Sequence, residues 1–147
     1  MKTYIRISFI YAVAALASGV FYREFTKWMD FTGKTTLSIT HTHLFVLGTL
    51  LFLIIALFNA VSTLTEQKRF KQFMVLYNIG LPFMIIMFYV RGITQVLNIE
   101  FSPATNAAIS GIAGISHLLV GISIIFLFLA LRCSNQISSQ HHKEEYL

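Results

Sequence analysis

The chain has 147 residues, of which 56% are hydrophobic and only 12% are charged, and its formal net charge is +5. Soluble domains carry about 25% charged residues, so this composition excludes an ordinary soluble domain and indicates a membrane protein. Because the basic residues lie between apolar blocks, we attribute the positive charge to membrane topology and expect no nucleic-acid partner.

Four apolar blocks follow one another along the sequence, each near the ~20 residues with which a helix crosses a bilayer. They cover about residues 4–22, 37–62, 73–97 and 104–131. Helices are expected because backbone polar groups in lipid must be satisfied within their own segment. The sequence therefore predicts an all-α fold, an integral membrane four-helix up-and-down bundle. It forms one transmembrane domain over residues 1–132, and a polar cytoplasmic tail follows over residues 133–147.

The first apolar block has features of a secretory signal. Lys2 and Arg6 precede an apolar core, and the small residues of ALASG follow it. The apolar run nevertheless continues through Val20, Phe21 and Tyr22. We therefore expect this block to be retained as the first membrane span.

Basic residues in the loops predict the orientation of the chain. The loop between the second and third blocks contains three basic residues, whereas the next loop contains only an acidic one: Lys68, Arg69 and Lys71 against Glu100. Both termini are therefore expected on the cytoplasmic side. The first loop disagrees, because it is expected outside yet contains Arg23, Lys27 and Lys34.

The second block opens with two histidines, in the stretch ITHTHLFVLG at residues 39–48. Residues two apart project about 200° apart around an α-helix, so His41 and His43 cannot both face the bundle interior. We favour His41, which shares a face with Gly48 seven residues later, and keep His43 as the alternative. A second interpretation is that both histidines bond to loop backbone in the first turns of the helix.

His117 lies deep in the fourth block, where an ionisable residue usually faces the bundle and has a partner or a function. It belongs to a stripe of small residues at helical spacing, formed with Ser110, Gly114 and Gly121. Such a stripe permits close helix packing. It equally predicts a groove in which a flat ligand lies, with His117 reaching the centre of that ligand.

The second and fourth spans of an up-and-down bundle run in the same direction, so their histidines can hold one metal between them. We predict His41, His43 and His117 as candidate metal ligands and haem b as the cofactor, with copper or zinc as alternatives. Gly48, Gly114 and Gly121 would make room for the porphyrin. The predicted span boundaries place His117 about 10 Å deeper than the other two histidines, which opposes this pairing.

Arg91 lies toward the outer end of the third block and needs an anion or a path to water. Glu24 is the expected protein partner, and a haem propionate is the alternative, because guanidinium groups fork onto carboxylates. An interfacial Arg91 in an aromatic belt with Tyr89 is a further interpretation. Tyr22 is expected in the same layer and completes the predicted cofactor site.

Three stretches carry a resemblance to known proteins: GVFYREFTK, FTGKTTLSITHTHLFVLG and AAISGIAGISHLLVGISIIFLFLAL. They resemble a family of small bacterial four-span membrane proteins of unknown function, which implies the bacterial cytoplasmic (inner) membrane. The segment HTHLFVLG is also similar to haem-ligating helices of the heme-copper oxidase superfamily, which implies an axial haem ligand. This chain lacks the many spans and additional histidines of an oxidase, so the resemblance favours haem binding over oxidase activity.

Three functions follow from these observations. The first is a membrane module that binds haem b or a transition metal near its outer face, for electron transfer or sensing, with a redox partner or a second copy. The second is a structural or accessory protein with a hydrogen-bonded histidine network, and the third is an oligomeric transporter or channel. No acid/base pair or nucleophile–base spacing is visible in the sequence, so an independent enzyme is not expected.

Overall fold

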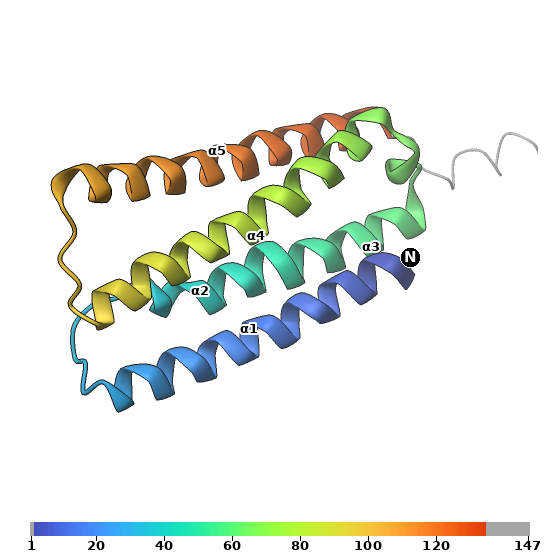
Figure 1. Cartoon of the computed structure of the whole chain (residues 1–147). Helices are drawn as coiled ribbons and strands as arrows, with labels where there is room; N and C mark the ends of the chain where they lie inside the picture. Colours follow the sequence, from blue (N-terminus) through green and yellow to red (C-terminus); the bar gives the residue numbers. More distant parts are fainter. Residues whose placement is uncertain (1, 135–147) are drawn as a thin grey trace, which may run out of the picture.

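The computed structural model describes residues 2–134 and is all-helical over that part of the chain (Figure 1). Helix α1 covers Lys2–Trp28, and the second span, Leu37–Val61, combines α2 (Leu37–His43), the π-helical η1 (Leu44–Leu50) and α3 (Leu51–Val61). The 3₁₀ turn η2 (Leu64–Glu66) leads into α4 (Lys68–Val96), and α5 (Pro103–Cys133) follows. Four helices of the described residues are long and apolar enough to cross a membrane, which confirms the predicted four-span fold.

The helices extend beyond the predicted apolar blocks because polar end turns can remain helical outside the hydrocarbon region. Helix α5 begins with a side-chain cap, since the Ser102 hydroxyl accepts from the backbone N–H of Thr105 at 3.2 Å. Helix α4 continues through Pro82 as one helix. The predicted polar tail lies outside the described residues from residue 135 onward.

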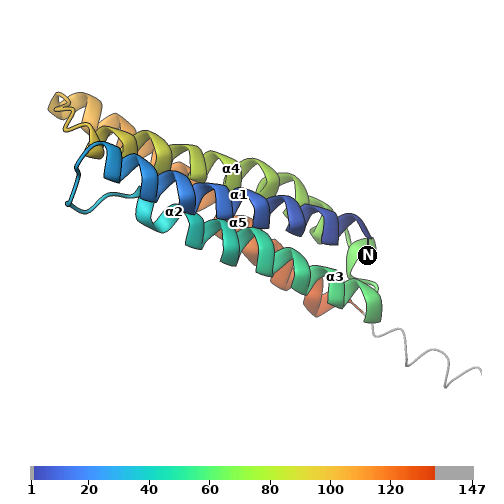
Figure 2. The same ribbon diagram turned by 90° about the horizontal axis from the view of Figure 1, so that it is seen from below.

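The four spans run along one common axis (Figures 1 and 2). Helix α1 packs against all three parts of the second span, α2 also packs against α4, and α5 packs along α4. The beginning of α1 and the end of α5 lie at the same end of the bundle (Figure 1). The arrangement is therefore up-and-down, and the α1–α2 and α4–α5 loops share the other end.

Glycines bring the second span and α5 close to α4. A Cβ at Gly92 would collide with Leu37, including its backbone nitrogen, and a Cβ at Gly80 would press on Leu119 and Val120 of α5. Such contacts let helix backbones approach closely. An aromatic core lies toward the end of the bundle where α4 begins. The rings of Phe70, Phe73, Tyr77 and Phe52 are buried there, and each contacts the next in a tilted or edge-on arrangement.

The second span changes its helical register directly after the histidine pair. In η1 the N–H of Leu51 donates to the carbonyl of Val46, five residues back, as in a π-helix. Side chains from other helices donate to carbonyls of this segment: Tyr77 Oη to Leu47 at 2.7 Å, and Ser8 Oγ to Thr49 at 2.8 Å. The π-helix is therefore held by side-chain hydrogen bonds from α4 and α1, and π-helical turns are frequent at functional sites.

Candidate functional site

His43 and His117 meet the same aromatic ring, that of Phe88 on α4. The His43 ring packs edge-on against Phe88 with centroids 4.8 Å apart, and the His117 ring lies 5.6 Å from it. The two imidazoles therefore cannot be farther apart than the sum of these two distances. The structure thus brings together one histidine from the second span and one from α5, and both contact the Phe88 ring of α4.

Both histidines are held in the same way. Nδ1 of His43 lies 2.9 Å from the carbonyl of Ile39, and Nδ1 of His117 lies 2.9 Å from the carbonyl of Ala113. A carbonyl only accepts, so Nδ1 must carry the proton, and in the neutral ring Nε2 then carries the lone pair. A histidine that ligates a metal typically donates its other ring N–H to a carbonyl or carboxylate in this manner.

An apolar groove begins beside His43 and continues between the second span and α5. A cavity of about 230 Å³ lies beside His43, bordered by Thr42, Val46 and Leu47. A second cavity of about 450 Å³ shares Val46 and Leu47 and extends along both spans. Its further lining comes from Leu50, Leu51, Ile54, Phe58, Ile124, Leu127, Phe128 and Leu131. The volume falls within the usual range for ligand pockets, about 300–1,000 Å³.

The glycine stripe of α5 faces open space. A Cβ built at Gly114 or Gly121 meets nothing within 4 Å, and His117 between them is exposed. Within the described chain these glycines therefore do not serve close helix packing, which was one of the two predicted roles. Ile124, seven residues after His117, lines the large cavity, so the stripe and the groove share one side of α5.

His41 faces α1 instead of His117. Its Cβ and Cγ lie 3.8 Å from the position of a Cβ at Gly19, and its Nδ1 is buried without a hydrogen-bond partner in the described chain. Gly48 faces the same way, and the ring of Tyr11 fills the space that a Cβ would need there. His41, which we favoured as the histidine facing the bundle interior, thus packs against α1 and not toward His117, and the gap predicted at Gly48 is filled by Tyr11. The physical cause is the divergence of residues two apart on a helix.

The expected difference in depth between the histidines is absent. Gly92 of α4 touches Leu37, and the neighbouring Arg91 bonds to Ser110, so Leu37 and Ser110 lie at the same level. His43 follows Leu37 by six residues, and His117 follows Ser110 by seven. The offset arose because the fourth apolar block was measured from its start, whereas the first turns of α5 project beyond the second span.

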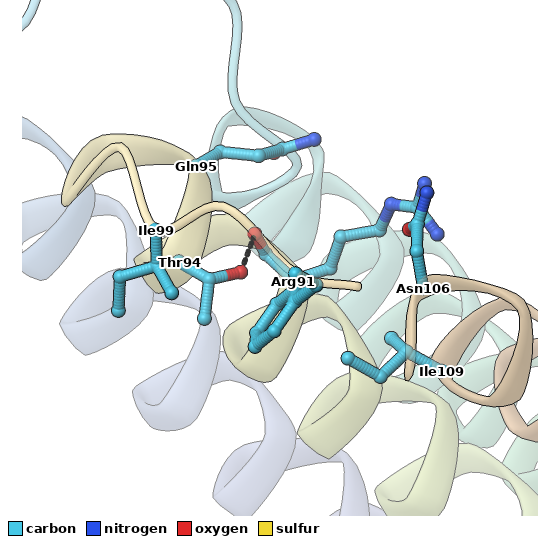
Figure 3. Close-up of a pocket in the computed structure, with 7 residues that line it drawn as sticks. Arg91, Thr94, Gln95, Ile99, Asn106 and Ile109 are labelled. Atoms are coloured by element: carbon cyan, nitrogen blue, oxygen red, sulfur yellow. Dashed lines mark hydrogen bonds between the residues drawn. The ribbon is translucent and has the colours of Figure 1, made fainter. Parts of the chain in front are cut away.

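Arg91 lies one turn after Phe88 on α4, toward the α4–α5 loop, in a polar cavity of about 180 Å³ (Figure 3). Its Nη1 donates to Ser110 Oγ at 2.8 Å, and its side chain extends toward Asn106. Glu24, the expected partner, pairs instead with the exposed Arg23 at 3.7 Å. Among the described residues Arg91 therefore has no carboxylate partner, and its charge is available to an anion.

Tyr22 lies on α1, and among the described residues no hydrogen bond or ring contact joins it to His43 or His117. Phe88 is the residue that the sequence did not reveal, because one phenylalanine among fourteen gives no signal of its own. The only indication in the sequence that Phe88 belongs to the site is that it lies three residues before Arg91, so that the two share one face of the helix.

The described chain offers few side chains that could ligate a metal ion. No group of three or more His, Cys, Asp or Glu side chains that could hold a metal ion occurs within residues 2–134. Structural zinc sites are almost always four-coordinate, so two imidazoles do not complete one. Haem iron differs, because the porphyrin supplies four nitrogen ligands and the protein needs to supply only the axial ones.

Comparisons with known proteins give this chain a family but no characterised relative. Neither the curated proteins nor the solved structures contain a significant match to this chain. A family model described as "Protein of unknown function (DUF2871)" matches residues 1–134, which is nearly the whole chain. The chain therefore belongs to the DUF2871 family of proteins of unknown function, as its resemblance to a small four-span family predicted.

Proposed function

We propose that this protein binds one haem b between the second span and α5, with Nε2 of His43 and of His117 as the two axial ligands. One observation carries the proposal. Each imidazole has its Nδ1–H bonded to the carbonyl four residues earlier, and both rings contact Phe88, while His43 also lines the beginning of the apolar groove. Two neutral imidazoles fixed in the same tautomer suit a haem iron.

The surroundings of the pair suit a flat, largely apolar ligand. Gly114 and Gly121 leave the face of α5 open on both sides of His117. The groove below is lined by aliphatic and phenylalanine side chains, which suit the porphyrin face. Arg91, one turn outward and without a carboxylate of the described chain, would bind a propionate. Copper or zinc stays the alternative cofactor, although either ion would need further ligands.

Two histidine ligands imply electron transfer more than catalysis. When both axial positions of a haem iron are occupied by protein, no open position remains for oxygen or a substrate. The haem would then pass electrons to a redox partner at the end of the bundle that carries the α1–α2 and α4–α5 loops, which lies nearer to His43 and His117.

We further propose that the protein lies in the bacterial inner membrane with both termini in the cytoplasm. Lys2 and Arg6 at the start of α1, the basic turn Lys68–Lys71 and Arg132 at the end of α5 all lie at one end of the bundle (Figure 1). Basic residues are retained on the cytoplasmic side. Haem would accordingly lie toward the outer face.

An absorption spectrum of the purified protein, oxidised and reduced, tests the cofactor. A Soret band that shifts on reduction, together with one iron per chain, is expected. A protein with neither a Soret band nor stoichiometric metal after expression with haem supplied would overturn the proposal. In that case the open stripe of α5 favours a structural protein in which a second copy packs on Gly114 and Gly121, and the oligomeric state in detergent would show it.

A further inference from the structure

A second groove lies on the opposite half of the bundle from His43 and His117. It has a volume of about 450 Å³ and runs between the first turns of α4 and the C-terminal half of α5. Its lining consists of Lys68, Lys71, Gln72, Val75 and Leu76 from α4 and Phe126 from α5. The groove therefore combines a basic end with an apolar floor.

The two lysines are one helical turn apart and both are exposed. Within the described residues the one ion pair is Arg23–Glu24, at the other end of the bundle, so neither lysine has an acidic partner there. They also stand in the first turn of α4, where the helix dipole is positive. This end of the groove therefore attracts an anion.

Neighbouring side chains fix the shape of the basic end. Arg69 Nη1 donates to Gln72 Oε1 at 3.2 Å, and its guanidinium lies 5.6 Å from the centre of the Phe126 ring. Arg69 is thereby tied across to α5 and flanks the groove as a third positive charge. From there Val75 and Leu76 continue toward the membrane interior along α4.

We propose that this groove binds an anionic phospholipid, with its phosphate between Lys68 and Lys71 and one acyl chain along Val75, Leu76 and Phe126. Free phosphate would satisfy the lysines but would leave the apolar floor empty, so the combined chemistry is that of a lipid. Anionic lipids are attracted to basic segments at the cytoplasmic ends of spans. The assignment is independent of haem, because no residue is shared with the groove of His43 and His117.

Native mass spectrometry of the detergent-purified full chain tests this site. Phosphatidylglycerol and phosphatidylcholine with identical acyl chains are added in turn, and the bound fraction is compared. Wild type should retain phosphatidylglycerol preferentially, and Lys68→Gln/Lys71→Gln should weaken that binding roughly 30-fold, because each basic residue contributes about fivefold. Lys27→Gln/Lys34→Gln removes the same charge at the other end and should leave binding unchanged.

A third variant separates a lipid from a soluble anion. Val75 is exposed, so Val75→Trp should fill the acyl groove without disturbing the core, and it should reduce phosphatidylglycerol binding while the lysines remain. Equal binding of the two lipids by wild type, or equal losses in the two lysine double variants, would overturn the site. Glycerol phosphate competing as well as the lipid would overturn the assignment to a phospholipid.

Discussion

Replacing Gly48 by alanine tests how closely the π-helical segment η1 packs against α1. A Cβ at this position would lie 2.6 Å from Tyr11 Cβ, and an atom so close to the backbone cannot rotate away. Tyr11 is also stacked on Phe52 with planes only 7° apart, so its ring has little room to move. Helix α1 would have to shift, and overpacking of this kind costs about 1–3 kcal/mol.

Gly111→Ala is the matched control, since a Cβ there meets nothing within 4 Å. Both substitutions gain helix propensity of about 1 kcal/mol, so their difference in the free energy of unfolding isolates the steric term. We expect Gly48→Ala to be less stable than Gly111→Ala by about 1–3 kcal/mol. The assay is loss of helical circular dichroism during denaturant titration in detergent micelles. Equal stability of the two variants would refute the packing of Tyr11 against Gly48.

Three further predictions concern the groove and its support. Tyr77→Phe removes the donor to the part-buried Leu47 carbonyl and should cost about 1 kcal/mol in the same titration, because this hydrogen bond is lost; an unchanged midpoint would show that this bond does not support η1. Gly121→Leu should keep the helical spectrum, since its Cβ points into open space, yet abolish haem uptake by filling the groove; full haem loading would place the cofactor elsewhere. Arg91→Gln should keep haem bound but lower its midpoint potential, because a positive charge beside a propionate favours the reduced iron; an unchanged potential would separate Arg91 from the haem.

The number of spans and their order could be predicted because every segment that crosses the hydrocarbon region must be apolar and must satisfy its backbone hydrogen bonds internally. A run of about 20 apolar residues in a membrane has few stable structures other than a spanning helix, and short loops make successive helices run in alternating directions. The ends of the helices were less predictable. The first turns of α4 contain the polar residues Lys68, Arg69, Lys71 and Gln72, which lie before the predicted apolar block but still belong to the helix, because the bundle continues beyond the apolar layer.

The candidate site could be predicted only in part. The sequence indicated His117 and the open glycine stripe around it, since both stand out in an apolar helix. It favoured His41 over His43 as the inward histidine, but which of the two meets His117 depends on the neighbours of each side of the second span, which the sequence does not give. It also missed Phe88, and it paired Arg91 with Glu24, whereas the structure pairs Glu24 with Arg23 and Arg91 with Ser110.

The most direct test of the haem proposal compares reduced-minus-oxidised absorption spectra of wild type and three single histidine variants. Wild type should show the sharp α band of a low-spin haem with two histidine ligands. His43→Ala and His117→Ala should each lose that band, because each removes one axial nitrogen. His41→Ala should keep the spectrum of wild type, because His41 faces α1. A spectrum that survives His117→Ala or His43→Ala, or that is lost in His41→Ala, would contradict the account.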